Sequence, residues 1–164
     1  MDFAFIRAKR HGMCDGHPNC KGAAMSFYRA IYTSRPFGFD TNTLNSILVH
    51  AQRANPSRGI TGALICREDV YLQLLEGPEA EVKRAMERIR RDDRHVEFRV
   101  HVEKIVPERM FGKWAMLHDP AVTWIWSQDE VRNDAIERTT EAEVEWFFEK
   151  LRDKADAPGT GSIE

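Results

Sequence analysis

The pattern of apolar and polar positions predicts a chain of alternating strands and helices. Five segments have the period of two that is typical of strands, or are short apolar runs bounded by turn residues: residues 28–34, 60–66, 70–76, 96–103 and 111–117. Residues 60–66 and 70–76 form a hairpin around Arg67-Glu68-Asp69. The strand at 70–76 is apolar on both faces, as expected of a central strand that is covered on both sides. The strand at 96–103 alternates strictly, so we expect one of its faces, with His101 on it, to meet water.

Two segments between these strands have apolar residues at helical spacing. The stripes are Leu44, Ile47, Leu48 and Ala51 in the first, and Val82, Ala85, Met86 and Ile89 in the second. The first helix should end at Asn55, because a residue that precedes proline disfavours the helical conformation. The order βαββαββ predicts an α+β, ferredoxin-like fold: a mixed five-stranded sheet with both helices on one face.

Two capping boxes predict two further helices near the C-terminus. They are Ser127-x-x-Glu130 and Thr140-x-x-Glu143, and the second opens a helix with a strong apolar stripe. Those apolar side chains need a surface to bury against. We therefore expect the C-terminal helices to cap the sheet face that the first two helices leave free.

Length and composition favour one domain with appendages. The 164 residues are 42% hydrophobic and carry a net charge of −2, which argues against a nucleic-acid surface. The sequence shows no membrane span and no signal peptide, so a soluble cytoplasmic protein is the simplest interpretation. We divide the chain into a poorly ordered extension (1–24), the main domain (25–118), a helical cap (119–155) and a flexible tail (156–164). Met25 directly precedes the first strand and could be the true translation start.

Gln73 is the first candidate for function, because it is an amide in the middle of an apolar strand. Burying an amide without partners costs on the order of 2–7 kcal/mol, so something polar must meet it. An amide carries a donor and an acceptor on one rotatable group, and turning it over exchanges them. Tyr32 points to the same face if neighbouring strands pair in register. From the residues alone, each could be a structural core residue or part of a switch.

Several segments together resemble the BLUF family, which are sensors of blue light using a flavin. They are Tyr32-Thr33-Ser34, residues 54–62, Leu72-Gln73-Leu74-Leu75-Glu76-Gly77, Asp93-Arg94-His95 and Trp114-Ala115-Met116, within a match over about residues 26–118. The resemblance implies a bound flavin, usually FAD, with its ring between the two helices on the sheet. It does not separate FAD from FMN.

The resemblance also implies a mechanism. Transient electron and proton transfer from Tyr32 lets Gln73 rotate or tautomerise, which rearranges hydrogen bonds to the flavin N5 and C4 carbonyl and shifts its absorption to the red. Ser34 would tune this network through its hydroxyl. Trp114 and Met116, two residues apart on the predicted last strand, should share a face, and the family makes that strand the output element. Core packing is the ordinary alternative for this pair.

Four further residues are candidate flavin contacts. Asn55 offers a donor and an acceptor for the amide-like edge of the ring, although it is also a normal residue at a helix end. Arg88 could reach a flavin carbonyl or phosphate, and the alternative is a solvated helix arginine. By resemblance, Arg94 and His95 lie near the flavin side chain. Ala54 departs from the family, whose members often carry a polar or ring side chain at this position.

The function predicted is a short BLUF photoreceptor that is not an enzyme. Its signal would pass through the C-terminal helices to a regulatory protein partner, with a homo-oligomer left open and no role for membrane, nucleic acid or metal. A metal site at Cys14, His17 and Cys20 matches no strong zinc pattern. One alternative is a flavin-free ferredoxin-like interaction module. The other is a small acyl-phosphate hydrolase that uses Arg88 or Arg94, but it lacks a glycine-rich anion loop.

Overall fold

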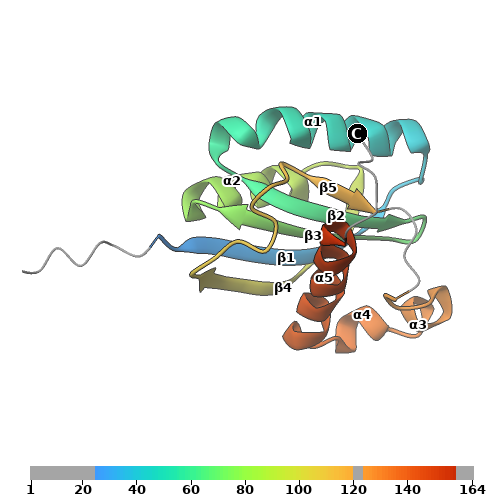
Figure 1. Cartoon of the computed structure of the whole chain (residues 1–164). Coiled ribbons are helices and arrows are strands. Elements are labelled where there is room, and N and C mark those ends of the chain that lie inside the picture. The colour runs from blue at the N-terminus through green and yellow to red at the C-terminus, as the bar shows by residue number, and fades with distance from the viewer. Residues whose placement is uncertain (1–24, 120–123, 158–164) are drawn as a thin grey trace, which may run out of the picture.

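A five-stranded sheet forms the centre of the computed structural model, which describes residues 25–119 and 124–157 (Figure 1). The strands are β1 (Phe27–Pro36), β2 (Thr61–Arg67), β3 (Val70–Gly77), β4 (His95–Val106) and β5 (Leu117–Asp119). Their order in the sheet is β4-β1-β3-β2-β5. The β2–β5 pairing is parallel and the other pairings are antiparallel, so the predicted mixed sheet is confirmed. The predicted extension 1–24, with its cysteine cluster, and most of the predicted tail lie outside the described residues.

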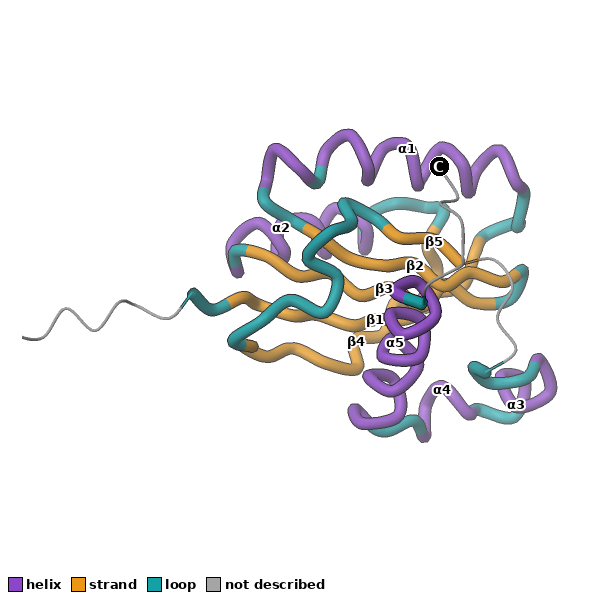
Figure 2. Tube along the Cα trace, in the orientation of Figure 1, coloured by secondary structure: helices purple, strands orange, loops and turns teal. Residues whose placement is uncertain are grey.

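Helices cover both faces of this sheet, as the sequence predicts. The helices are α1 (Thr41–Ala54), η1 (Pro56–Arg58), α2 (Glu79–Arg90), α3 (Gln128–Arg132), α4 (Ala135–Arg138) and α5 (Glu141–Asp156). Figures 1 and 2 show α1 and α2 on one side of the sheet and α5 across the other. Two separate hydrophobic cores result. One lies under α1 and α2, and the other lies under α3, α4 and α5. We call these the helix face and the cap face.

The position of β3 explains why its sequence is apolar on both faces. It lies between β1 and β2, and all eight of its residues are buried. Leu72 and Leu74 contribute to the cap-face core, whereas Tyr71 and Leu75 contribute to the helix-face core. Gln73 therefore points to the helix face, on the same side as Tyr71 and Leu75.

The predicted last strand over 111–117 is wrong. Only Leu117–Asp119 is a strand, and the chain turns at residues 110–113. The backbone N–H groups of Met110 and Phe111 each donate to the Glu76 carboxylate at 3.0 Å. These donors are satisfied by a side chain from β3 instead of by a neighbouring strand, so a turn replaces the expected extended segment.

A bulge in β4 overturns the prediction for His101. The register between β1 and β4 shifts by one residue between Ile31 and Tyr32, so Val100 packs on the helix face and Val102 on the cap face. His101 lies at this shift. Its Nε2 is 2.9 Å from Thr33 Oγ1, and it is partly buried instead of facing water. Burial lowers the pKa of His101 to about 4.

The cap has three helices where two are predicted. The Ser127 capping box is complete and opens α3, but α3 ends after five residues and the single turn of α4 follows. Thr140 Oγ1 accepts the Glu143 N–H at the start of α5, whose stripe of Val144, Phe147, Phe148 and Leu151 is buried as predicted. Within the two described stretches, no helix is long and apolar enough to cross a membrane.

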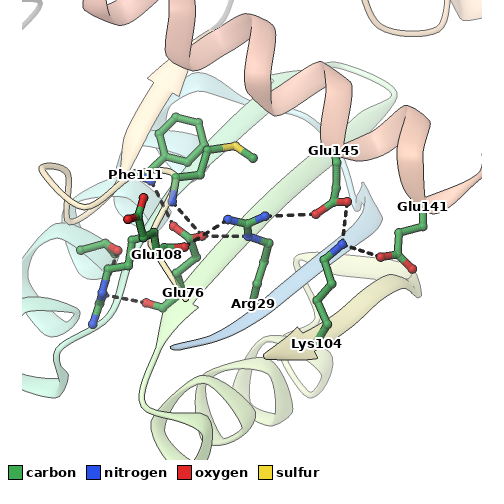
Figure 3. Close-up of polar contacts among 10 residues, drawn as sticks. Arg29, Glu76, Lys104, Glu108, Phe111, Glu141 and Glu145 are labelled. Atoms are coloured by element: carbon green, nitrogen blue, oxygen red, sulfur yellow. Dashed lines mark hydrogen bonds and ion pairs between the residues drawn. The ribbon is translucent and has the colours of Figure 1, made fainter. Parts of the chain in front are cut away.

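A polar network ties α5 to the sheet (Figure 3). Arg29 of β1 donates from Nε to Glu76 at 2.8 Å and from Nη1 to Glu145 of α5 at 3.1 Å. Lys104 of β4 bridges Glu141 and Glu145 at 2.6 and 2.7 Å. The Glu76 side chain has no exposed surface, so its charge depends on Arg29 and on the loop N–H groups described above.

Candidate functional site

A cavity of about 280 Å³ lies over the helix face of the sheet, between α1 and α2. Its volume is slightly below the range of about 300–1,000 Å³ that is usual for ligand pockets. Apolar side chains from both helices form much of its wall. Its polar lining residues are His50, Asn55, Arg58, Gln73, Arg88, Asp92, Arg94 and His95. Five of the predicted cofactor residues are therefore brought to one cavity.

Tyr32 and Gln73 form a buried pair beside this cavity. They are direct partners across the β1–β3 ladder, which is the in-register pairing that the sequence predicts. The Tyr32 hydroxyl donates to Gln73 Oε1, and the two residues are 0% and 3% exposed. Burial raises the pKa of Tyr32 well above its usual value, so the phenol is protonated at neutral pH. The Tyr32 ring also stacks on Phe98, with ring centroids 4.4 Å apart.

The other end of the Gln73 amide meets Met116. Gln73 Nε2 donates to Met116 Sδ at 3.4 Å. A thioether is a weak acceptor, so this bond holds the amide less firmly than a carbonyl would. Trp114 does not share this face as predicted: it packs against the cap-face core, with its ring centroid 6.0 Å from that of Phe111. The turn at residues 110–113, in place of a strand, removes the alternation on which that prediction depended.

Asn55 joins the end of α1 to the segment that carries Met116. Its Nδ2 donates to the Ala115 carbonyl at 2.9 Å, and the residue is 6% exposed. The Trp114 carbonyl accepts the Gly62 N–H at 3.1 Å, from the start of β2. A Cβ at Gly62 would lie 2.1 Å from the Leu74 carbonyl oxygen, so only glycine fits at this point.

Arg94 and Asp92 form a bidentate pair at the end of α2. Arg94 Nε donates to Asp92 Oδ1 at 2.8 Å, and Nη2 donates to Oδ2. The hydrogen bonds from Arg94 lower the pKa of Asp92 to about 2. Arg94 Nη1 also reaches Ser46 of α1 at 3.5 Å, so the turn between α2 and β4 contacts α1 at the border of the cavity.

Ser34 and His95 form a second buried polar pair. Ser34 Oγ lies 2.8 Å from His95 Nδ1, and the residues are 1% and 7% exposed. Burial lowers the pKa of His95 to about 4, so the imidazole is neutral at pH 7. Ser34 thus contacts His95, which lines the cavity, but Ser34 itself is not among the lining residues.

Sequence reasoning missed Arg58, which lines the cavity from η1. Its Nη1 is buried and has no hydrogen-bond partner among residues 25–119 and 124–157. A single arginine in a polar turn gives no sequence signal that separates it from a solvated residue. Ala54 also lines the cavity, where its small side chain leaves room.

An apolar-walled cavity with a weakly held amide and an unpaired guanidinium fits a planar, polar-edged, anionic ligand, and comparison with known families identifies one. The family model described as sensors of blue light using FAD matches residues 27–117. The chain belongs to the BLUF family. The role of a blue-light photoreceptor that uses FAD follows from this membership, and it disfavours the flavin-free interaction module.

Solved BLUF structures share this fold. The ground state of BlsA matches with a TM-score of 0.66 and 23% identity, over 77% of this chain and 87% of BlsA. The dark state of the BLUF protein BlrB matches with a TM-score of 0.63 and 21% identity, over 79% and 97% of the two chains. A bacterial light-regulated adenylyl cyclase matches at 0.55 and 23%, over 76% of this chain but only 36% of the cyclase. The comparison with curated proteins found no match.

The residues of this BLUF chain fit a flavin. Asn55 and Gln73 supply amide groups, and the three arginines of the cavity exceed its one carboxylate, Asp92, which Arg94 already pairs. A nucleotide cofactor would bring the negative charge that this lining lacks. The described stretches contain no group of three His, Cys, Asp or Glu side chains that could hold a metal.

Proposed function

We propose that Tyr32 and Gln73 are the photoactive switch of this protein. The observation that carries the proposal is their buried hydrogen bond beside the cavity, with the Gln73 amide turned toward a weak acceptor. FAD, when bound, supplies the absorption of blue light and an excited state that accepts an electron. Tyr32 holds the proton, and Gln73 can exchange its donor and acceptor by turning over.

We propose that Asn55, Gln73, Arg88 and Arg94 hold the flavin directly. Asn55 and Gln73 match the hydrogen-bonding edge of the ring, and Arg88 and Arg94 supply charge-assisted donors. Ser34 and His95 act behind them, since each satisfies the other. A neutral His95 keeps a further positive charge out of the site at pH 7.

We further propose that the signal leaves through the loop that carries Met116. A change at the Gln73 amide alters its hydrogen bond to Met116 Sδ. The loop that carries Met116 is also bound at its other end, where the Phe111 N–H donates to the Glu76 carboxylate. Arg29 donates both to Glu76 and to Glu145 of α5. This chain of contacts supports α5 as the element that presents the signal to a protein partner. A sensor without enzymatic activity of its own is the role that this arrangement supports.

The test is an absorption spectrum of the purified protein with FAD, in the dark and immediately after a blue flash. We expect a small red shift that decays in the dark. Bleaching of the flavin without that shift would indicate a redox flavoprotein and would contradict the proposal. The partner, the oligomeric state and a cytoplasmic location stay predictions.

A further inference from the structure

Phe98 of β4 stacks directly on Tyr32, the proposed photoactive tyrosine. Their ring centroids are 4.4 Å apart, and the ring planes differ by 25°. Tyr32 pairs with Val100 across the β1–β4 ladder, so Phe98, two residues earlier on β4, is its diagonal neighbour. Phe98 packs against the helix-face core, and neither Phe98 nor Tyr32 is among the residues that line the cavity. The stack is therefore a contact within the protein, outside the cavity wall.

An irregular stretch of β4 brings Phe98 to this position. The register between β1 and β4 shifts by one residue between Thr33 and Arg35, so β4 carries an extra residue here, in a second bulge. Glu97, which directly precedes Phe98, has a φ of 51°, in the left-handed region that residues other than glycine rarely adopt. Arg35 Nε pairs with the Glu97 carboxylate at 2.6 Å. Bulges and strained residues of this kind often re-aim a side chain next to a functional site. Here the side chain that follows the strained residue is the one that meets Tyr32.

Arg90 of α2 contacts the Phe98 ring from a second element. Its guanidinium lies over the ring, 5.1 Å from the centroid. A cation over an aromatic face is attracted by the quadrupole of the ring. Phe98 is thus fixed by the backbone of β4 and by a side chain of α2, so it can serve as a support for the fully buried Tyr32.

The Tyr32 ring needs a support that does not change during the light cycle. In the proposed function, Tyr32 gives one electron to the photo-excited flavin and its hydroxyl proton along the hydrogen bond to Gln73 Oε1, and it takes both back on recombination. Because the Gln73 amide rearranges in this cycle, its hydrogen bond cannot hold the phenol throughout. The stack on Phe98 does not involve that amide, and an aromatic pair favours the stacked orientation by a factor of about two to ten.

We propose that Phe98 is a positioning residue that keeps the Tyr32 hydroxyl aimed at Gln73 and so sets the yield of the red-shifted state. The inference rests on the proposed function, since it assumes that Tyr32 and Gln73 are the switch. Phe98 does not line the cavity, so its effect should pass through Tyr32 and leave the binding of FAD intact.

The first test is an NMR spectrum of the FAD-bound protein in the dark, with labelled tyrosine, and it involves no photochemistry. The chain has three tyrosines, so Tyr32→Phe identifies the Tyr32 ring signals. The ring current of Phe98 should displace these signals in the wild type. Phe98→Leu, which has no flat face, should remove the displacement, and Phe98→Tyr, which restores the ring, should keep it. Identical Tyr32 signals in the wild type and in Phe98→Leu would overturn the stack.

The second test measures how much red-shifted state forms per absorbed photon. We expect Phe98→Leu to lower this yield about two- to tenfold, the factor by which the stack favours one orientation, while Phe98→Tyr restores it. A wild-type yield in Phe98→Leu, together with a lost ring-current displacement, would show a merely structural contact and would overturn the proposal. If Phe98→Leu does not fold, Phe98→Met replaces it, because its unbranched side chain fills irregular space without supplying a flat face.

Tyr28→Leu is the matched control. Tyr28 lies in the same helix-face core, and the Lys83 ammonium of α2 lies 5.1 Å from its ring centroid, as Arg90 lies over Phe98. This variant removes a ring and its cation contact from the same face and should leave the yield and the Tyr32 signals unchanged. An equal fall in yield would show a general effect of a weakened core and would overturn the role of Phe98.

The wild-type protein tests the proposed function separately. If its red shift is absent, the switch of Tyr32 and Gln73 is contradicted. If its red shift is normal and Phe98→Leu preserves the yield, only the role of Phe98 is contradicted.

Discussion

The two faces of the sheet satisfy their charges in opposite ways. On the cap face, Arg29 lies between Glu76 and Glu145, and Lys104 lies between Glu145 and Glu141. Among the described residues, the buried side-chain polar atoms without a partner on this face are the neutral indole N–H groups of Trp124 and Trp126. On the helix face, a cavity remains, Arg58 Nη1 has no acceptor in the part of the chain that the structure describes, and Gln73 donates to sulfur. The cap face pairs Arg29 and Lys104 within the chain, whereas the cavity of the helix face is complementary to a molecule that the chain does not supply.

Gln73→Leu tests the helix face with the largest expected effect. Leucine keeps the approximate volume but removes both the donor and the acceptor, so the light-induced red shift should be lost entirely while FAD stays bound. The measurement is the difference spectrum between flash and dark. Tyr32→Phe should lose most or all of the shift as well, because the phenylalanine ring has no proton to give.

Gln52→Leu is the control for Gln73→Leu. Gln52 is exposed on α1 and does not line the cavity. This variant should keep the normal shift. A normal shift in Gln73→Leu would refute the switch, whatever the control shows.

Arg29→Met tests the cap face, where the effect should be on stability. The substitution leaves Glu76 buried without its cation, and breaking a buried pair in this way costs about 3–5 kcal/mol. Urea unfolding of the FAD-bound protein measures this loss. The red shift should remain, since Arg29 does not line the cavity.

The exposed pair of Arg132 and Asp129 on α3 provides the comparison. Arg132→Met should change the free energy of unfolding by less than about 1 kcal/mol, as expected of a surface ion pair. A similarly small loss in Arg29→Met would mean that the network in Figure 3 does not hold the cap to the sheet.

Acid should destabilise both faces through one histidine on each. His95 and His101 have folded-state pKa values lowered to about 4, against an ordinary value of 6.5. The unfolded chain therefore binds more protons between pH 6.5 and 4, and stability falls as the pH falls through this window. From pH 7 to pH 5 each histidine should cost about 2 kcal/mol.

The free energy of unfolding of the apo-protein, measured from pH 7 to pH 5, tests this effect. His95→Gln and His101→Gln should each flatten the profile. Profiles of both variants that run parallel to that of the wild type would contradict the assignment.

Arg58→Met should have the smallest effect, and it should raise the stability of the apo-protein instead of lowering it. The substitution removes a buried donor that has no acceptor among the described residues, and with it the free-energy cost of burying that donor. The thermal midpoint of the apo-protein should therefore rise, by an amount that corresponds to about 1 kcal/mol. A lower midpoint for the apo variant would mean that Arg58 already has a stabilising partner.

The sequence predicts the parts of the site that depend on strand alternation. Tyr32 and Gln73 are correctly paired because both lie in regular segments, and a period of two assigns each side chain to a face. The prediction fails at Trp114 and His101 for two different reasons. Long-range bonds from Glu76 replace a strand before Trp114, and a bulge shifts the register at His101. Neither event leaves a local mark in the residues involved.

The cavity itself could be predicted only in part. Asn55, Arg94 and His95 are found through the resemblance to a family, and Arg88 through its position on a helix flank. Arg58 is identified only once the three-dimensional structure shows that its guanidinium is buried. The absence of an acceptor is a property of the folded neighbourhood, and no pattern of residue types records it.

The strand order also constrains when the protein can fold. The first strand of the chain, β1, lies between β3 and β4, while only β2 and β3 are joined by a short turn. Local contacts form fastest, so we expect the β2–β3 hairpin to gain protection from hydrogen exchange before β1 does. Protection of β1 ahead of the hairpin would contradict this order. During synthesis, Gln73 is therefore made 41 residues after Tyr32. The first strand, β1, cannot be paired along its whole length on both sides until Val106 has left the ribosome.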